Sequence, residues 1–275
     1  RLHKRLTTPD DPARSVVEGA AELGVPADPA AQVVHGSTIA TNALLERRGA
    51  RTALITTQGF ADVLEIGRQN RPDLYALVPR RPAPLVPREW RFELPERLSA
   101  QGQVLLPLDP QSVRDLIPRL QAAHIESVAV CFLFSYLRPE HERLVEHILE
   151  AGSQTSAGNA SDFYVTLSSA LLPEYREYER TAATVINAYV TPVMDRYLGQ
   201  LEARLAPRSL RVMQSNGGCL TAVSARRQAA RTVLSGPAGG AVGALAVARE
   251  ALGVINGVGP TIITFDLGGT STDVC

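Results

Sequence analysis

The chain has 275 residues, enough for one or two hydrophobic cores, and its apolar and aromatic fractions of 45% and 5% are those of an ordinary α/β protein. Its 28 Lys and Arg residues balance its 28 Asp and Glu residues, so bulk charge gives no support for binding nucleic acid or an anionic membrane. Three widely spaced cysteines form neither a metal-binding spacing nor a disulfide framework, which favours a reducing cytoplasm, and neither a signal peptide nor a long apolar run is found.

Signals for helices and strands alternate along the first seventy residues. Asp11 and Pro12 suit the start of a helix, and Gly24 suits the position just past its end. The following apolar runs and turn residues predict a strand at 32–34, a helix at about 39–48 closed by Gly49, a strand at 53–57 and a short helix ending at Ile66.

Residues 71–95 differ in composition, because six prolines in this stretch exclude regular helix and most interior strand. The stretch resembles an insertion that packs by its own side chains and includes a strand from Trp90 to Leu94. Its five arginines form either a solvated face or a surface that contacts substrate or a partner.

Regular alternation returns in the second half of the chain. The predicted elements are helices at about 110–123 and after Pro139, strands at 127–132, 163–167 and 210–214, a long helical tract from Pro173 toward Leu205 with a bend at Pro192, a helix starting near Ser235 and a last strand at 261–265. His141 and His147 are expected to face solvent, and the segment 174–180 to be a helix packed by tyrosines with salt bridges between its charged residues. Alternating strands and helices predict an α/β sheet covered by helices on both faces.

The turn that follows the last strand has the residues of a phosphate-binding loop. It reads Asp266-Leu267-Gly268-Gly269-Thr270-Ser271-Thr272-Asp273. Gly268 and Gly269 allow backbone N–H groups to approach an anion, the three hydroxyl residues add donors, and the two flanking carboxylates are suitable ligands for hydrated Mg²⁺. The alternative is a tight hairpin, which also favours glycines and hydroxyl residues.

A run of small residues, from Ser235 to Ala244, precedes this turn by about thirty residues. Small side chains let a helix approach another backbone closely, so the run indicates either a tightly packed helix start or a hinge helix beside a nucleotide. The combination of this helix with the strand and turn that follow is more specific than either part alone.

Several motifs together resemble the hydantoinase A/5-oxoprolinase/acetone carboxylase family. They are, in chain order, His35-Gly36-Ser37-Thr38-Ile39-Ala40-Thr41-Asn42-Ala43-Leu44-Leu45-Glu46, Ile55-Thr56-Thr57-Gln58-Gly59-Phe60, Ile66-Gly67-Arg68-Gln69-Asn70-Arg71-Pro72, Pro173-Glu174-Tyr175-Arg176-Glu177-Tyr178-Glu179-Arg180, the small-residue run and the glycine turn. Ser37 departs from the threonine more usual in the family but keeps the hydroxyl. The segment 66–72 is more similar to the hydantoinase and ketone-carboxylase branches.

This resemblance implies an actin/Hsp70-like (ribonuclease H-like) ATPase lobe, with a mixed sheet covered by helices on both faces. The helix near 236–251 and the glycine turn would be the connect-1 and phosphate-2 elements. Residues 1–255 would form the first lobe without its phosphate-1 strand, and residues 260–275 the start of the second lobe. We therefore expect a fragment trimmed at both ends.

The resemblance also implies an activity, which is the ATP-dependent hydrolysis of a cyclic amide such as a hydantoin or 5-oxoproline through phosphorylation of its carbonyl oxygen. ATP and Mg²⁺ would be the cofactors, and a hydantoinase B-like second subunit, within an oligomer, the partner. Two alternatives stay open: a subunit of an ATP-dependent ketone carboxylase of acetone or acetophenone type, and a non-catalytic Hsp70-like ATP-binding protein.

Site residues follow from the same resemblance. Asp266 and Asp273 would be catalytic residues: Asp266 would hold Mg²⁺, and Asp273 would support the turn or orient water. The phosphate contacts would come from Gly268, Gly269, Thr270, Ser271 and Thr272. A close approach of the nucleotide or of a lobe to the helix would be allowed by Gly236, Gly239 and Gly240. The His-Gly-Ser-Thr turn would face the cleft. His35 would have a catalytic role there, and Ser37, Thr38 and Asn42 would contact the substrate. Further substrate contacts would come from Arg68, Asn70 and Arg71, for which surface salt bridges are the alternative.

Overall fold

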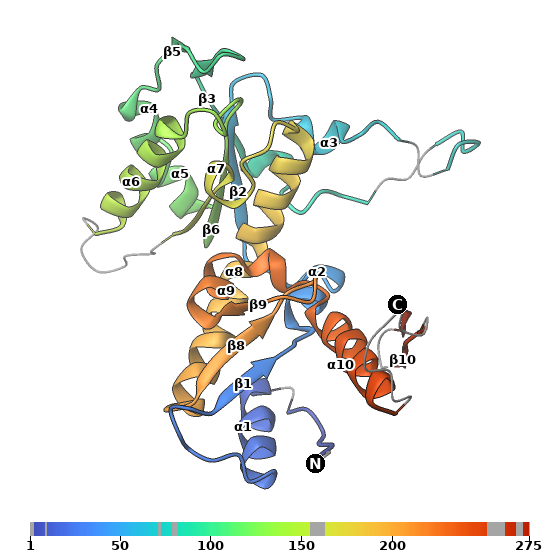
Figure 1. Cartoon of the computed structure of the whole chain (residues 1–275). Helices are drawn as coiled ribbons and strands as arrows, with labels where there is room; N and C mark the ends of the chain where they lie inside the picture. The colour runs from blue at the N-terminus through green and yellow to red at the C-terminus, as the bar shows by residue number, and fades with distance from the viewer. Residues whose placement is uncertain are drawn as a thin grey trace. The chain divides into compact units, whose positions relative to one another are not determined.

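The computed structural model describes residues 3–8, 10–70, 73–78, 82–154, 163–251, 262–267 and 272–274. Contacts divide the chain into two compact units (Figure 1). The first unit combines Arg1–Glu46 with Val193–Cys275, and the second is Arg47–Pro192. Helix α8 (Glu177–Leu205) belongs to both units, because it continues through Pro192 as one α-helix.

The second unit is built on a four-stranded parallel sheet. Its strand order is β3 (Arg91–Leu94), β2 (Thr52–Thr57), β6 (Ser127–Cys131) and β7 (Tyr164–Leu167). Helices α4 (Pro110–Arg114), α5 (Ile117–Ala122) and α6 (Glu140–Gln154) lie on one face, and the first half of α8 lies on the other (Figure 1). The remaining elements of this unit are α3 (Val63–Ile66), the 3₁₀ turn η1 (Arg88–Trp90), the hairpin β4–β5 (Arg97–Leu98, Val104–Leu106) and α7 (Ser168–Leu171).

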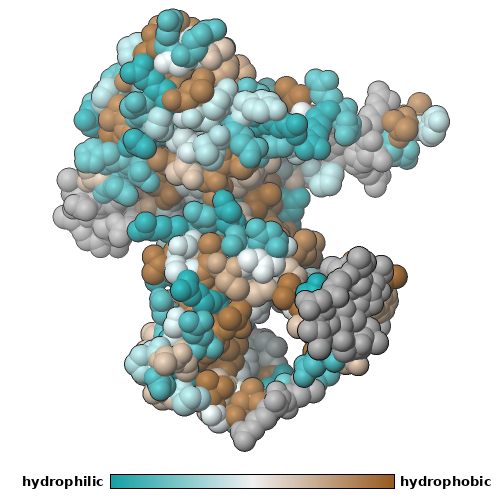
Figure 2. Space-filling view, viewed as in Figure 1, coloured by the Kyte–Doolittle hydropathy of each residue, from teal (hydrophilic) through white to brown (hydrophobic). Residues whose placement is uncertain are grey.

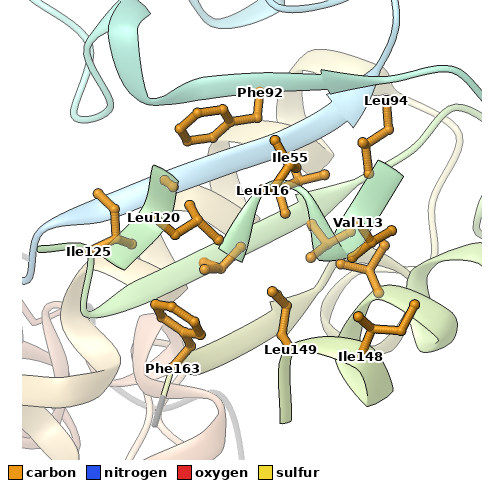
Figure 3. Packing of buried hydrophobic residues seen from close by; sticks show 14 of the residues in the cluster. Ile55, Phe92, Leu94, Val113, Leu116, Leu120, Ile125, Ile148, Leu149 and Phe163 are labelled. Atoms are coloured by element: carbon orange, nitrogen blue, oxygen red, sulfur yellow. The ribbon is translucent and has the colours of Figure 1, made fainter. Parts of the chain in front are cut away.

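Side chains that alternate along the central strands fill two separate cores. Ile55 and Val130 point into a large core against α4, α5 and α6, where Leu116, Leu120 and Leu149 are buried (Figure 3). Their neighbours Leu54 and Ala129 pack on the opposite face against Val185 and Ala188 of α8. Burying one large aliphatic side chain contributes about 1.5–3 kcal/mol, so both faces stabilise the sheet. This confirms the prediction of an α/β sheet covered by helices on both faces.

The first unit holds a smaller, mixed sheet. Strand β8 (Ser209–Met213) pairs in parallel with β1 (Gln32–His35) and antiparallel with β9 (Cys219–Thr221). The helical elements of this unit are α1 (Pro12–Glu22), α2 (Ile39–Leu45), the second half of α8, α9 (Ala222–Arg227), η2 (Ala229–Thr232) and α10 (Ser235–Ala251). Strands β10 (Phe265–Leu267) and β11 (Thr272–Val274) form an antiparallel pair.

Several expected elements differ in the structure. The helix predicted at 110–123 is two helices, because Pro118 lies in the first turn of α5, where its missing N–H costs no hydrogen bond. Helix α2 ends at Leu45, and Arg47, with φ 56°, makes the left-handed turn expected near Gly49. The last strand begins at Phe265 rather than 261. The predicted lobe boundary at 255–260 lies outside the described residues, so the lobe assignment stays a prediction.

Two surface features complete the description. Segment 73–78 follows α3 and carries exposed apolar side chains, with Leu77 fully exposed and Leu74 72% exposed (Figure 2). Within the described ranges, none of the helices combines the length and the apolar character needed to span a bilayer.

Candidate functional site

Two motifs that are far apart in the sequence meet in the first unit. The hydroxyl of Ser235, at the start of α10, accepts a hydrogen bond from the backbone N–H of Ser37 at 3.2 Å and donates one to the Ser37 carbonyl at 3.0 Å. Both serines are buried. The reciprocal pair fixes the His-Gly-Ser-Thr turn, which follows β1, against the first turn of the small-residue helix.

Glycines make this contact close. A Cβ on Gly36 would lie 3.1 Å from the Ser235 carbonyl oxygen and 3.4 Å from the Gly236 Cα, which are backbone atoms that cannot easily move. A Cβ on Gly236 would lie 3.2 Å from the Thr38 Cγ2 methyl. The two glycines therefore let two backbone segments touch, which is the packing role expected of the small-residue run.

His35 ends β1 and forms a partly buried pair with Tyr197 of α8. The Tyr197 hydroxyl lies 2.7 Å from His35 Nε2, and the two rings are tilted by 49°. Burial lowers the pKa of His35 to about 4 and raises the pKa of Tyr197 to about 12, with a hydrogen bond from Ser37 acting against the rise. His35 is therefore neutral near pH 7 and acts as a hydrogen-bonding group rather than a cation.

The start of α2 adds hydroxyl and amide groups beside this pair. Thr38 is the residue before α2 and is exposed, and the Asn42 side-chain amide lies 3.5 Å from its hydroxyl oxygen. The Thr41 hydroxyl accepts a hydrogen bond from Leu234 N–H at 2.8 Å, which is a second link between α2 and the segment before α10. The structure therefore brings together His35, Ser37, Thr38, Asn42 and Gly236 in one unit.

The other glycines of α10 are less constrained. A Cβ on Gly239 would make an ordinary contact of 3.8 Å with Met213, and a Cβ on Gly240 would have no described atom within 4 Å. Packing against the described residues therefore gives no reason for glycine at position 240, where Ala would favour the helix.

The hairpin β10–β11 flanks the glycine turn. Asp266 and Asp273 are register partners across the two strands, as are Leu267 and Thr272. The predicted phosphate contacts Gly268, Gly269, Thr270 and Ser271 lie outside the described residues, and for Asp266, Thr272 and Asp273 only the backbone is described. A phosphate-binding loop and a tight hairpin turn would both be flanked by paired strands of this kind, so the strand pairing does not distinguish the two interpretations. Among the described side chains, no three His, Cys, Asp or Glu residues gather as a metal site would require.

The remaining substrate candidates lie in the second unit. Arg68 and Asn70 line a cavity of about 560 Å³ between the 64–70 segment, the 82–85 segment and α8. Arg68 Nε also donates to Glu179 Oε1 at 2.7 Å, as the salt-bridge alternative predicted. Arg71 lies outside the described residues.

A buried polar network at the carboxyl ends of β6 and β7 was not expected from the sequence. Glu142 of α6 accepts hydrogen bonds from Phe132 N–H at 3.0 Å, from the Ser168 hydroxyl at 2.6 Å and from the Ser169 N–H and hydroxyl. Arg180 of α8 donates to the Ser168 hydroxyl at 2.8 Å and to the Phe132 carbonyl at 2.9 Å, and is 1% exposed. Arg180 is therefore a core residue rather than part of the surface salt bridges expected for 174–180.

His141 also differs from the expectation that it faces solvent. Its Nδ1 lies 2.8 Å from Glu96 Oε2, and its side chain is 12% exposed. Glu96 in turn accepts from the Thr57 hydroxyl, at the end of β2. No periodic pattern in the chain indicates either buried carboxylate, because each partner lies on a distant element.

The architecture is an α/β fold with mixed sheets and is shared with ATP-dependent enzymes of known structure. The crystal structure of ATP-dependent caprolactamase from Pseudomonas jessenii superposes with a TM-score of 0.80 at 31% identity, over 100% of this chain and 40% of that chain. A nucleotide-free acetone carboxylase structure also gives 0.80, at 28% identity, over 98% of this chain and 39% of that one. The fold is thus of the ATPase type that the resemblance implied.

Family models assign the chain more narrowly. The model for the hydantoinase/oxoprolinase N-terminal region matches residues 1–152, and the model for hydantoinase/oxoprolinase matches residues 180–275. The chain therefore belongs to the hydantoinase/oxoprolinase family.

Curated relatives agree with this assignment. The caprolactamase subunit alpha of Pseudomonas jessenii is 32% identical over 100% of this chain and 40% of its own length. The 5-oxoprolinase 1 of Arabidopsis thaliana is 36% identical over 91% of this chain and 20% of its own length, and the 5-oxoprolinase of Saccharomyces cerevisiae is 34% identical over 87% and 20%. The chain thus spans between one fifth and two fifths of these proteins.

Proposed function

We propose that this protein takes part in the ATP-dependent hydrolysis of a cyclic amide of hydantoin or 5-oxoproline type, as the A subunit of a hydantoinase-like enzyme. The observation that carries the proposal is the Ser37–Ser235 hydrogen-bond pair, which joins the His-Gly-Ser-Thr turn to the start of the helix leading to the glycine turn. The names of the 5-oxoprolinase and caprolactamase relatives support the reaction class.

The residues present fit ATP and Mg²⁺. A Cβ at position 240 would meet no described atom within 4 Å, which supports a nucleotide beside the first turns of α10. Backbone N–H groups of Gly268 and Gly269 and the hydroxyl groups of Thr270, Ser271 and Thr272 would hold phosphate oxygens. Asp266 and Asp273 would offer carboxylate oxygens, which are the ligands that Mg²⁺ prefers.

ATP would supply a phosphoryl group for the substrate's carbonyl oxygen, which makes the carbonyl carbon more electrophilic. Water could then add to that carbon and the ring C–N bond could break with the nitrogen protonated, and hydrolysis of the resulting acyl phosphate would release carboxylate and phosphate. The role of this chain is then positioning and charge neutralisation. Neutral His35, held by Tyr197, would orient a substrate or phosphate oxygen together with Ser37, Thr38 and Asn42. Asp266 would be the metal ligand, and Asp273 would support the turn or orient water.

A second candidate function is that of an ATP-dependent ketone carboxylase subunit. It is favoured by one observation, the TM-score of 0.80 with acetone carboxylase. A hydantoinase B-like partner subunit within an oligomer is part of both proposals, because the caprolactamase relative is named as a subunit. A cytoplasmic location stays a prediction from the cysteine pattern.

The test is substrate-stimulated ATP hydrolysis by the complete protein together with its second subunit, across hydantoins, 5-oxoproline, lactams and ketones with bicarbonate. We expect stimulation by a cyclic amide and its loss in Asp266→Asn, while Asp115→Asn, an exposed substitution of the same type, retains it. Stimulation only by a ketone with bicarbonate would move the assignment to the carboxylase. No stimulation by any compound, or full turnover in Asp266→Asn, would contradict the proposal.

A further inference from the structure

Two hydroxyl groups and an imidazole ring form a short hydrogen-bonded chain at the end of strand β1. The Tyr197 hydroxyl lies 2.7 Å from Nε2 of His35, and the same hydroxyl interacts with the Ser37 side chain. The Ser37 hydroxyl oxygen also accepts a hydrogen bond from the N–H of Ile39, the first residue of α2, at 3.1 Å. The chain therefore runs from the start of α2, through Ser37 and Tyr197, to the ring of His35.

The Ser37 hydroxyl donates its hydrogen to Tyr197. A serine hydroxyl has a single hydrogen to donate, and Ser37 is 8% exposed, so this hydrogen needs an acceptor within the protein. Among the described residues, Tyr197 is the acceptor that its hydroxyl meets. Burial raises the pKa of Tyr197 and the Ser37 contact lowers it, as a hydrogen bond donated to the phenol oxygen does.

The Tyr197 hydrogen is then directed to Nε2 of His35, which accepts it. In the reverse arrangement, Nε2 would carry a hydrogen and donate it to Tyr197. One of the two hydroxyl hydrogens, that of Tyr197 or that of Ser37, would then lack an acceptor among the described residues. A buried donor without an acceptor is costly, so the first arrangement is favoured.

Nδ1 of His35 is the ring nitrogen that remains open. It makes no hydrogen bond with any described residue. In the described part of the chain, the buried side-chain nitrogen and oxygen atoms without a partner are Asp11 Oδ1, Asp62 Oδ1 and Arg180 Nε, so Nδ1 of His35 is not a buried atom. Burial of the ring as a whole lowers the pKa of His35 to about 4, and a neutral ring that accepts at Nε2 carries its hydrogen on Nδ1.

We propose that Tyr197 and Ser37 are positioning residues, which hold neutral His35 as its Nδ1–H tautomer so that Nδ1–H donates a hydrogen bond to a carbonyl or phosphoryl oxygen of a ligand. The inference rests on the proposed function, in which it makes His35 a donor to an oxygen rather than a general base. A base needs a ring nitrogen with a free lone pair, and the lone pair on Nε2 is occupied by Tyr197. Ser37 acts on the ligand through Tyr197 and His35, because its own hydroxyl is buried and engaged.

Nitrogen-15 NMR of the full chain identifies the tautomer directly. The couplings between the carbon-bound ring protons and the two ring nitrogens show which nitrogen carries the hydrogen, and His35→Asn assigns the signals of His35 among the 5 histidines. At pH 7.5 we expect an unprotonated Nε2 and a protonated Nδ1. A hydrogen on Nε2, an equal mixture of the two tautomers or a charged ring at this pH would overturn the inference.

Matched variants show whether Tyr197 sets the tautomer. Tyr197→Phe removes the hydrogen that occupies Nε2, so we expect the two nitrogens of His35 to share the ring hydrogen. Tyr189→Phe makes the same change earlier on α8 and should leave the tautomer as it is, and so should Ser37→Thr, which keeps the hydroxyl. An unchanged tautomer in Tyr197→Phe, with folding verified by circular dichroism, would remove Tyr197 from this role.

Separate titrations show which oxygen the ring contacts. MgATP and hydantoin are added one at a time to the complete protein, and the Nδ1 and Hδ1 signals of His35 are followed. A shift with MgATP indicates a phosphoryl oxygen at Nδ1, and a shift with hydantoin indicates a carbonyl oxygen. Signals of His35 that stay unchanged with both ligands would contradict the donor role.

Steady-state kinetics separate positioning from a purely structural role. In amide-stimulated ATP hydrolysis by the complete protein with its second subunit, Tyr197→Phe should lower kcat about tenfold and change KM by less than about threefold, because the lost hydrogen bond acts on the reacting oxygen. A raised KM with an unchanged kcat would contradict this expectation. The tautomer is measured without ATP or substrate, so a hydrogen on Nε2 rejects this inference even where hydrolysis is observed. The expected tautomer without any stimulated hydrolysis would reject the proposed function instead.

Discussion

The hydroxyl group of Tyr197 lies 2.7 Å from Nε2 of His35, and this contact joins helix α8 to the end of strand β1. Tyr197 is 8% exposed, so the contact is largely shielded from water. His35 lies two residues before Ser37, which contacts Ser235. The His35–Tyr197 contact therefore connects the candidate site to helix α8 within the first unit.

His35 gives a pH-dependent contribution to stability. Burial lowers its pKa from 6.5 to about 4, so the unfolded chain binds more protons than the folded one between these values. The contribution is present above pH 6.5 and is lost as the pH falls toward 4. Because His35 is half-buried, we expect its share of the loss to be about 1–2 kcal/mol.

Urea unfolding at pH 7.5 and pH 4.5 measures this contribution, with His35→Asn as the variant that should lack it. NMR titration of the histidine ring protons measures the pKa directly. Tyr197→Phe should keep the low pKa, because burial rather than the hydrogen bond is its main cause. A ring signal of His35 that titrates near 6.5 would be incompatible with this account.

Substitution by alanine should change the free energy of unfolding in opposite directions at Gly36 and at Gly240. Gly36→Ala forces a Cβ against backbone atoms at 3.1 Å, and we expect a loss of about 1–3 kcal/mol. Gly240→Ala has no described atom within 4 Å and gains helix propensity, so it should add up to ~1 kcal/mol. Thermal unfolding compares the two.

The same Gly240→Ala protein also tests the proposed nucleotide site. A stabilised variant with weaker MgATP binding would support a nucleotide beside this position, whereas unchanged affinity would remove Gly240 from the site. The complete protein is required for this measurement, since the proposed site includes residues of the glycine turn.

Gly49 is required by packing rather than by its backbone angles. A Cβ at this position would lie 2.1 Å from the Tyr189 ring, and Tyr189 is 7% exposed. We expect Gly49→Ala to lower the free energy of unfolding by about 1–3 kcal/mol, measured by urea unfolding. Tyr189→Leu removes the ring, so the alanine should cost less in that background; an equal cost in both would argue against the clash.

Glu142 and Arg180 should be coupled although Ser168 lies between them. Removing either charge alone, by Glu142→Gln or Arg180→Met, leaves the other buried without compensation, and we expect losses of about 3–5 kcal/mol. The double variant should lose less than the sum of the single losses. A double-mutant cycle in urea gives the coupling energy, and strict additivity would mean that the two groups are independent.

Local patterns in the chain predicted most of the elements. The period of apolar residues and the turn residues located the central strands β2, β6 and β8 and helices α1 and α10 to within a few residues. They failed where a proline divided a helix at Pro118, and where short strands β4 and β5 depend on pairing with each other. The glycine turn and the His-Gly-Ser-Thr motif were visible because their residues are adjacent in sequence.

The sequence by itself determined the fold class, the family and the two glycine-rich motifs, because these depend on periodicity and on neighbouring residues. Tertiary structure alone decided that Tyr197 is the partner of His35, that Ser235 holds Ser37, and that Arg180 is buried. These pairs join residues up to 198 positions apart, and no local pattern encodes which distant side chain will satisfy a buried polar group. The Arg68–Glu179 ion pair was decided in the same way, because Glu179 is brought to Arg68 only by the packing of α8.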